Sequence, residues 1–203
     1  AAIQQLNAGQ AITDSFTAVS SDGTASQIVT VTIFGTDDAP VLSNVASVAA
    51  YTENSPPVLL SPATVTITDV DNQTLASAAV TITDFVAGDV LSFTNNNAAT
   101  YGNITASYSN GVLSLASAGN TATLAQWQAA LDAVTYSSTS DNPNTFGTDT
   151  TRSISWVVND GQLSSNTQTT TLTITAVDDA PVLSNVASVA GYIENSPPVA
   201  LSP

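Results

Sequence analysis

The sequence predicts an all-β chain made of tandem antiparallel β-sandwich units, with one short helix in the central unit. Three observations support this. Valine, isoleucine and leucine alternate with threonine or serine in several short segments, a pattern typical of half-buried strands. The pair Asn110-Gly111 between two apolar runs predicts a two-residue hairpin turn. A long stretch of sequence also recurs, which predicts repeated structural units.

The recurring stretch divides the chain. Residues 37–62 and 178–203 match at 23 of 26 positions, differing only at 50, 52, 59 and their counterparts, at an offset of 141 residues. This identity indicates a tandem duplication. We therefore expect residues 1–38 to be the C-terminal part of one unit, 39–179 a complete unit and 180–203 the N-terminal strands of the next. The complete sandwich should cover about 41–177, with a partial sandwich at each end.

Within these limits the apolar spacing places the elements. Alternation predicts strands near 29–33, 65–67, 154–158 and 172–174. Between 121 and 134 the spacing becomes that of one helix face, carried by Leu124, Trp127, Leu131 and Val134. We expect a helix near 123–133, capped by Thr121 or Thr123 and closing one end of the sandwich. Trp127 should then lie in the core rather than form a sugar-stacking platform.

Composition excludes several kinds of chemistry. The chain has 16 acidic residues, a single basic residue (Arg152), no histidine and no cysteine, for a net charge of −15. Disulfides, zinc or copper sites, Ser-His-Asp triads and lysine Schiff bases are therefore unavailable. The charge repels nucleic acid and anionic membranes, and no stretch is apolar enough to enter a bilayer. The partner that this charge favours is a hard cation such as Ca²⁺.

The acids gather around the repeat junction. Asp37 and Asp38 occupy the linker, Glu53 follows it, and Asp69 and Asp71 end a predicted strand. Calcium takes six to eight oxygens from several carboxylates and carbonyls, and residues i and i+2 of a strand share a face. We therefore expect these five acids to form a calcium site at the first junction. The alternative reading is that they are solvated turn residues, since Asp is a common turn former.

Two further acids are weaker candidates for the same chemistry. Asp22 and Asp160 each precede a glycine in a predicted turn ahead of the last strands of their unit.

The linkers carry a resemblance to known repeats. GTDDAPVL and AVDDAPVL resemble the linkers of VCBS and cadherin-like repeats in giant bacterial (RTX-type) surface adhesins. Residues 3–41 are similar to the C-terminal half of a VCBS repeat. The central unit, with DVDNQTLASAAVTITDF, LAQWQAALDAVTYSSTSDNP and RSISWVVNDG, resembles the larger cadherin-like repeat. The resemblance implies an immunoglobulin- or cadherin-like sandwich in each unit.

The resemblance also implies ligands and a role. It places calcium at the first junction on the five acids above, and at the second on Asp178, Asp179 and Glu194, with that junction's Asp-x-Asp lying beyond Pro203. The linker departs from the cadherin pattern, being Asp-Asp-Ala-Pro rather than Asp-x-Asn-Asp-Asn. The implied role is a calcium-rigidified extender, or stalk, of a secreted bacterial adhesin that supports surface attachment, cell–cell adhesion or biofilm. The expected partners are neighbouring repeats and, through other domains, cell-surface glycans.

Other functions are weighed against this role. One is a structural subunit of an extracellular filament or sheath, assembled when incomplete terminal units complete one another by strand addition. Another is a carbohydrate-binding adhesin domain. Catalysis is disfavoured, because no His or Lys activates a Ser or Thr, and the carboxylates of Asp69 and Asp71 should lie too close together to flank a scissile bond.

Overall fold

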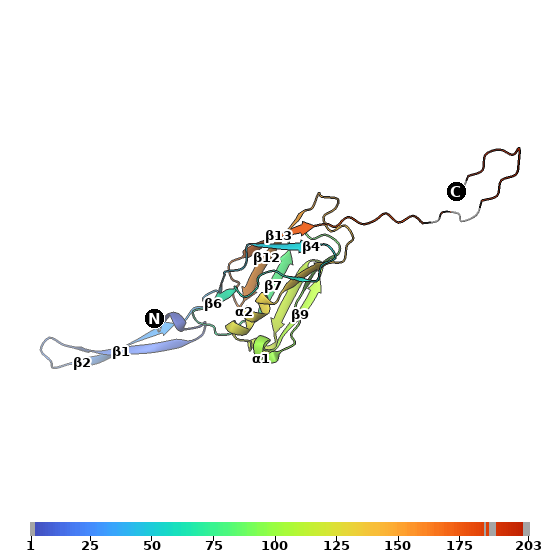
Figure 1. The fold of residues 1–203 in the computed structure, drawn as a ribbon. Coiled ribbons are helices and arrows are strands. Elements are labelled where there is room, and N and C mark those ends of the chain that lie inside the picture. Colours follow the sequence, from blue (N-terminus) through green and yellow to red (C-terminus); the bar gives the residue numbers. More distant parts are fainter. Residues whose placement is uncertain (1–2, 185, 187–189, 201–203) are drawn as a thin grey trace.

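A computed structural model describes residues 3–184, 186 and 190–200 of the chain. A central β-sandwich occupies the middle of the molecule. A long hairpin leaves one end of it, and the segment after residue 175 leaves the opposite end (Figure 1). The first copy of the repeated sequence therefore lies within the sandwich, and the second copy lies beyond its far end.

The central unit is mostly strand. Its strands are β3 (Val41–Ser43), β4 (Val48–Thr52), β5 (Val58–Leu59), β6 (Thr66–Thr68), β7 (Ser77–Ile82), β8 (Asp89–Ser92), β9 (Ile104–Ser109), β10 (Val112–Ser117), β11 (Thr135–Ser138), β12 (Thr151–Asn159) and β13 (Gln168–Thr175). Its helices are α1 (Ala98–Tyr101) and α2 (Leu124–Asp132), with a 3₁₀ turn at Ala118–Asn120. These bounds confirm an all-β fold with a helix near 123–133, whereas the four-residue helix α1 was not predicted.

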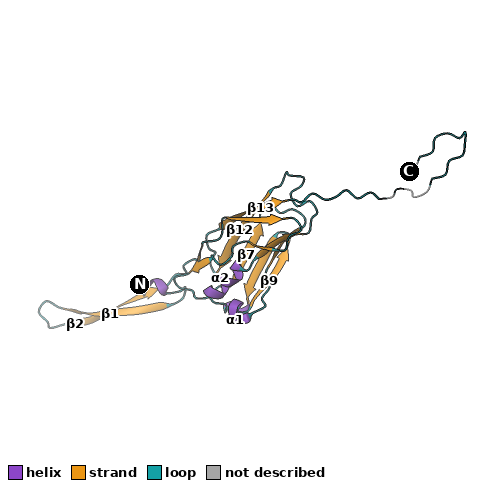
Figure 2. Ribbon diagram, in the orientation of Figure 1, coloured by secondary structure: helices purple, strands orange, loops and turns teal. Residues whose placement is uncertain are grey.

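The strands form two layers (Figure 2). One is a six-stranded sheet in the order β4-β13-β12-β7-β10-β9, and the other contains the sheet β5-β11-β8 and the pair β3-β6. Among the pairs in the described residues, β4 with β13 is parallel and the rest are antiparallel. The parallel pair matters for the site, because β4 and β13 end at the same side of the sandwich.

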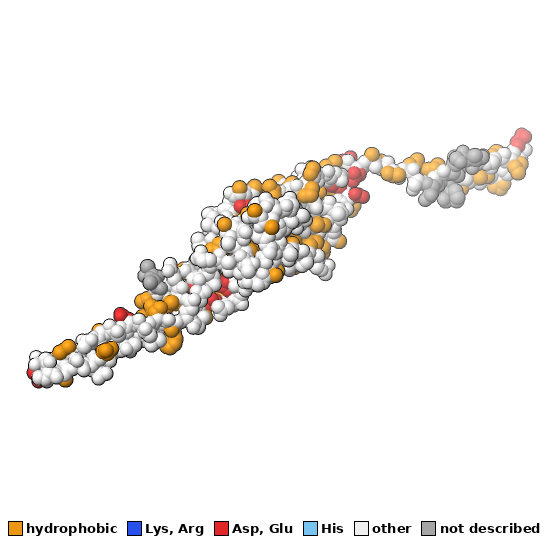
Figure 3. Space-filling view, turned by 90° about the horizontal axis from the view of Figure 1, so that it is seen from below, with side chains coloured by type: hydrophobic (Ala, Val, Ile, Leu, Met, Phe, Trp, Pro, Cys, Tyr) orange, Lys and Arg blue, Asp and Glu red, His pale blue; other side chains and the backbone are white. Residues whose placement is uncertain are grey.

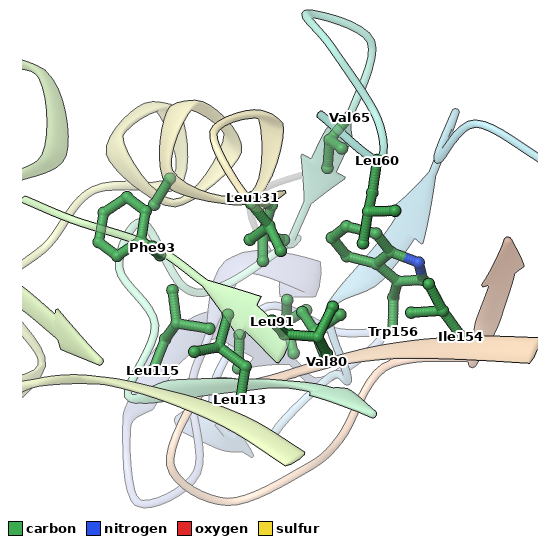
Figure 4. Packing of buried hydrophobic residues seen from close by; sticks show 14 of the residues in the cluster. Leu60, Val65, Val80, Leu91, Phe93, Leu113, Leu115, Leu131, Ile154 and Trp156 are labelled. Atoms are coloured by element: carbon green, nitrogen blue, oxygen red, sulfur yellow. The ribbon is translucent and has the colours of Figure 1, made fainter. Parts of the chain in front are cut away.

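The core lies between the layers (Figure 4). Val80, Leu113 and Ile154 of the large sheet face Leu60 and Leu131 from the other side. Both tryptophans are buried, and the indole N–H of each makes a hydrogen bond. The indole Nε1 of Trp127 donates to the Leu75 carbonyl at 3.2 Å, and that of Trp156 donates to Thr170 Oγ1 at 3.0 Å. Trp127 is therefore a core residue, as its place on the apolar helix face predicts.

Local signals place the helix and the tight turn correctly. Thr123 is the N-cap of α2, and it forms a reciprocal capping box with Gln126. The carboxylate of Asp132 and the amide of Gln128 accept backbone N–H groups of residues 64, 65 and 67, so α2 lies along β6. Asn110 and Gly111 both have positive φ, 47° and 82°, as the two-residue turn between β9 and β10 requires.

One buried ion pair has no counterpart in the sequence-based expectations. Arg152, on β12, donates from Nε to Asp89 Oδ2 at 2.6 Å, with both side chains 1% exposed. The Tyr136 hydroxyl also donates to Asp89, and burial, followed by the hydrogen bond and charge of Asp89, raises the Tyr136 pKa. The guanidinium further donates to the carbonyls of Pro143 and Asp149. The single base of the chain thus fixes the loop 139–150 to the sandwich.

The hairpin of β1 (Ala11–Val19) and β2 (Ser26–Phe34), preceded by a 3₁₀ turn at Ile3–Gln5, stands apart from this core. The alternation predicted near 29–33 is present, but Val29 and Val31 are 37% and 48% exposed rather than buried. The reason is that no second layer covers the hairpin in the described residues. An Asn7 Nδ2 to Asn72 Oδ1 hydrogen bond of 2.9 Å joins its base to the sandwich.

Beyond β13, the described residues of 176–200 contain no strand. The expectation that 180–203 supply strands of a further unit falls partly on residues 185, 187–189 and 201–203, outside the described part, and it stays a prediction. Within the described residues, no helix is long and apolar enough to cross a membrane.

Candidate metal centres at the two ends of the sandwich

The first candidate centre lies where the linker 35–40 enters the sandwich. The linker passes the loop that follows β6 and the turn that follows β12. The Asp38 backbone N donates to Asp71 Oδ2 at 3.2 Å. Asp69 Oδ1 accepts the backbone N–H groups of Asp71 and Asn72, at 3.2 and 2.9 Å. The expected meeting of the linker with the Asp-x-Asp loop is therefore present.

Asp37 contacts both loops. Its Oδ1 accepts from Gln162 Nε2 at 2.9 Å and from Asn72 Nδ2 at 3.4 Å. Asp160 lies in the same turn as Gln162, and its Oδ1 accepts the N–H groups of Gln162 and Leu163 at 2.6 and 2.8 Å. Asp160, a weaker sequence candidate, thus joins the cluster. Figure 3 shows acidic side chains gathered where the hairpin meets the sandwich, and again where the C-terminal segment leaves it.

In each of three acids of this cluster, one oxygen has no partner. The second carboxylate oxygens of Asp37, Asp69 and Asp160 are buried and make no hydrogen bond. Burial, followed by the negative charge of Asp160, raises the pKa of Asp37. Burial is also the largest cause raising the pKa of Asp69 to about 6, with the charge of Asp71 adding to it. Buried carboxylates usually have a partner, and the single base of the chain is bound to Asp89 at 2.6 Å instead.

The donor chemistry fits a hard cation. Carboxylate oxygens with free lone pairs are what Ca²⁺ takes, at 2.3–2.6 Å and in flexible geometry. In the described part of the chain, however, no group of three or more acidic side chains is already arranged to hold a metal ion. The residue types and their unpaired oxygens therefore suit Ca²⁺, but the present geometry does not yet form a site. The carboxylates would have to turn toward a common ion.

Glu53 does not belong to this cluster. It follows β4, which runs parallel to β13, so it reaches the far end of the sandwich. Its backbone N donates to the Thr175 carbonyl at 2.8 Å, and its Oε2 accepts the Val177 N–H at 2.8 Å. The prediction that Glu53 reaches back toward Asp37 and Asp38 is wrong. Closeness in sequence suggested the first linker, but the direction of β4 carries Glu53 to the second.

A second candidate centre follows from this placement. Glu53 is 3% exposed, and its Oε1 is buried without a partner. It holds the backbone immediately before the exposed pair Asp178 and Asp179. That pair lines a surface hollow of about 500 Å³ together with Asp141, Asn142 and Asn144 of the loop that Arg152 fixes. Asp141 and these amides were not predicted. A loop rich in Asp and Asn beside a linker was the only signal.

The remaining sequence candidates lie elsewhere. Glu194 is exposed in the C-terminal segment. Asp22 lies at the tip of the hairpin, away from the linker, where the Ser20 hydroxyl donates to it at 2.6 Å and the Thr24 N–H at 3.1 Å. These hydrogen bonds lower its pKa to about 2. Asp22 therefore behaves as a solvated turn residue in this chain.

Comparison with known proteins finds only distant structural likeness. No family model and no curated protein sequence matches the chain. Among solved structures it is similar to extracellular cadherin domains 3–6 of protocadherin gamma B2, with 15% identity and a TM-score of 0.29 over 76% of this chain and 30% of that one. It is also similar to the human desmocollin-1 ectodomain, with 15% identity and a TM-score of 0.26 over 76% and 24%. The chain spans less than a third of either, and so low a TM-score carries no argument about function.

Proposed function

We propose that the chain is a calcium-stiffened extender module of a large, repetitive, secreted bacterial surface adhesin. One observation carries the proposal. At the first junction, three carboxylates from three different segments each bury an oxygen without a partner. A bound cation would satisfy all three segments together, which is how a flexible linker becomes a stiff joint.

Electrostatics favours cation binding at the first junction. Two like charges about 4 Å apart repel by roughly 1 kcal/mol in bulk water and more near protein, and the chain carries a net charge of −15. A cation at the first junction would replace this repulsion with attraction and tie Asp37 to the loops that carry Asp69 and Asp160. Extracellular calcium modules bind at about 10⁻⁴–10⁻³ M. At about 1 mM free calcium, a site with a dissociation constant of about 10⁻⁴ M would add about 1.4 kcal/mol to the stability of the folded state.

The second end supports the same role. Glu53 holds the backbone of Val177 at 2.8 Å, so the outgoing linker starts from a fixed point on the sandwich. Asp178 and Asp179 face the Asp141 loop across the hollow. Each end of the sandwich therefore offers acidic groups to an adjoining segment, as a module repeated in a stalk requires.

One observation disfavours a sugar-binding domain within the described residues. Trp127 and Trp156, the side chains best suited to stack on a sugar ring, are fully buried. The hollow at the second junction has one exposed aromatic ring, Phe146, among acidic and amide side chains. Any glycan contact would then come from other domains of the adhesin.

A matched pair of variants tests the first junction. Asp160 and Asp22 occupy equivalent Asp-Gly turns, one in the cluster and one at the hairpin tip. Calorimetric titration of calcium should show weaker binding for Asp160→Asn and unchanged binding for Asp22→Asn. Equal affinity in both variants and in the unaltered chain would reject the ligand assignment.

Stiffening has a separate readout. Small-angle scattering with calcium should give a narrower range of hairpin-to-sandwich arrangements than scattering in chelator. Circular dichroism should change little, because the sandwich buries its own core without a metal. If the maximum dimension and flexibility are the same in both buffers, the junction is not stiffened by calcium.

A further inference from the structure

We propose that two copies of this chain pair side by side through the outer edge of β9. The two β9 strands would run antiparallel about a two-fold axis at Ser107, so that the two large sheets become one continuous sheet. The proposal rests on three observations: an edge without charge or proline, backbone groups on that edge that match those of a second copy, and a position along the side of the sandwich, away from both junctions.

The edge belongs to the central sandwich. β9 is an outer strand of the six-stranded sheet, and within the described residues it pairs with β10 alone. Its six residues include no proline and no charged side chain. Other outer strands have features that keep edges apart, since β3 follows Pro40 and β5 has two residues between Pro57 and Pro62. An edge strand without such features is a template for pairing with another chain.

The hydrogen bonds of β10 show which backbone groups of β9 are free. The N–H of Ser117 donates to the Ala76 carbonyl, on the β7 side, at 3.0 Å. Backbone groups alternate in direction along an antiparallel strand, so the even-numbered residues of β10 bond to β9. Their partners in the register are Thr105, Ser107 and Ser109. The N–H and C=O groups of Ala106 and Tyr108 therefore point away from β10, to the open edge.

These free groups are self-complementary. Asn95 Nδ2 donates to the Ile104 carbonyl at 3.0 Å, which closes one end of the edge and leaves Ala106 to Tyr108 open. About an axis at Ser107, Ala106 of each copy would lie beside Tyr108 of the other, and each such pair exchanges two hydrogen bonds. All four free groups of one copy would then bond to the same four groups of the second. A two-fold contact between identical surfaces is of this kind.

Charge favours the same surface. None of the 16 acidic residues lies on the six strands of the large sheet, whose one charged residue, Arg152, is buried. Beside Ser107 on the outer face, the row of side chains continues through Ser114, Ala79 and Val157. Two chains that each carry −15 repel one another, and this edge brings small uncharged side chains together instead of acids. Because salt screens that repulsion, association should strengthen as salt is added.

Neighbouring repeats would leave this edge open. The two junctions lie at the ends of the sandwich, and β9 lies along its side, at the edge of the large sheet opposite β4 (Figure 1). A single contact of this size should be weak, but modules aligned along two stalks would add their contacts together. That consequence for whole stalks rests on the proposed function, whereas the pairing of two copies does not.

Cysteine crosslinking tests the axis, since the chain has no cysteine of its own. Ser107→Cys, oxidised in chelator, should give a disulfide-linked dimer on a non-reducing gel. Its two Cα atoms would face each other at about 4.5 Å, within the range of a disulfide. The matched control is Thr105→Cys, on the same strand and face. Its two copies would be four residues apart along the strands, about 13 Å, so this variant should stay monomeric.

A mixture of variants tests the register. Thr105 of one copy would lie beside Ser109 of the other. Thr105→Cys and Ser109→Cys chains should therefore stay monomeric when oxidised separately and form a mixed dimer when oxidised together. Equal dimer yields from Ser107→Cys and Thr105→Cys would indicate random collision and overturn the proposal, and so would the absence of the mixed dimer.

Charged variants test the chain without a crosslink. Ser107→Asp sets two carboxylates opposite each other at the axis. Ser114→Asp, its neighbour on β10, places them three strand spacings apart, about 14 Å, beyond the Debye length of about 8 Å at physiological salt. Both positions are exposed, so neither change should unfold the sandwich.

Sedimentation in chelator at increasing protein concentration compares these variants. The unaltered chain and Ser114→Asp should form dimers, and Ser107→Asp should lose them. A chain that stays monomeric at every concentration, or dimers that Ser107→Asp does not reduce, would overturn the proposal. Because no calcium is present, a failure of the proposed calcium function would leave these results unchanged.

Discussion

The two copies of the repeated sequence adopt different structures. Within residues 37–62 the chain forms β3, β4 and β5, and Leu42 is fully buried. The described residues of the second copy form no strand, and Leu183 is 86% exposed. Because 23 of 26 positions are identical, the difference comes from surroundings rather than from propensity. A strand of this kind forms when a sheet is present to accept its backbone and cover its side chains.

One element is nevertheless the same in both copies. Asn54 and Asn195 both have positive φ, 62° and 64°. The N–H of Ser55 donates to the Thr52 carbonyl and that of Ser196 to the Ile193 carbonyl, each at 3.1 Å. Asparagine tolerates this conformation and closes the turn locally. The turn is therefore encoded by its own residues, whereas the strands beside it depend on partners.

The largest expected difference between the copies comes from truncating the same leucine in each. Leu42→Ala empties a fully buried site and should lower the free energy of unfolding of the sandwich by about 2–5 kcal/mol. Leu183→Ala should change it by less than about 0.5 kcal/mol. Urea denaturation followed by tryptophan fluorescence measures both, since Trp127 and Trp156 report the core. Equal destabilisation would mean that the second copy also packs against the sandwich.

The glutamates give the next largest difference. Glu53→Gln keeps the shape of a buried side chain at the second junction and removes its charge. It should weaken calcium binding there about tenfold, or about 1.4 kcal/mol. Glu194→Gln should leave the binding unchanged, because Glu194 is exposed in the C-terminal segment. Calorimetric titration of calcium into each variant and into the unaltered chain measures the difference. If Glu53→Gln binds like the unaltered chain, the second centre does not include this residue.

Features that depend on short stretches could be predicted from the sequence. The capping box of α2, the turn at Asn110-Gly111 and the alternation of β12 and β13 are properties of a few consecutive residues. The meeting of Asp37, Asp38 and the Asp-x-Asp loop was also predictable, because a linker and the strand ends beside it share one side of a sandwich.

Features that depend on strand direction or on distant partners could not be predicted. Glu53 was assigned to the wrong end because the parallel pairing of β4 with β13 leaves no local mark. The ion pair of Arg152 with Asp89 joins residues 63 positions apart, and the sequence gives no reason to choose Asp89 among the 16 acids. Asp160 was undervalued because its turn looks the same as that of Asp22, and only folding places one beside the linker.

A smaller difference should follow from removing one hydroxyl in each copy. The Tyr51 hydroxyl donates to the Ser138 carbonyl at 3.3 Å, and its ring packs edge-on against Tyr136 at 5.1 Å. Tyr51→Phe keeps the ring contact and removes the hydrogen bond, which should cost about 0.5–1.5 kcal/mol. Tyr192→Phe should cost nothing measurable, since the Tyr192 hydroxyl bonds only within its own exposed turn. Thermal unfolding of the two variants and the unaltered chain gives the comparison.

The smallest expected effect concerns pH and distinguishes the two linkers. The Asp69 pKa rises from 3.8 to about 6 on folding, so between these values the folded chain binds more protons than the unfolded one. Stability should therefore fall as the pH rises from about 4 to 6 and stay at the lower level above that. In chelator, lowering the pH from 7 to 5 should raise the unfolding midpoint by less than about 4 °C, since the site is partly solvated and screened. Calcium should remove the effect, because a bound cation keeps the carboxylate ionised.

The variants Asp69→Asn and Asp178→Asn separate the two ends in this measurement. Asp69 is half-buried against the first linker, whereas Asp178 is exposed at the second. Asp69→Asn should abolish most of the pH response in chelator, and Asp178→Asn should retain it. Asp22 does not interfere, since its lowered pKa of about 2 places its own transition below this window. A midpoint that falls on acidification in chelator would contradict the raised pKa, and with it the view that the first cluster is short of positive charge.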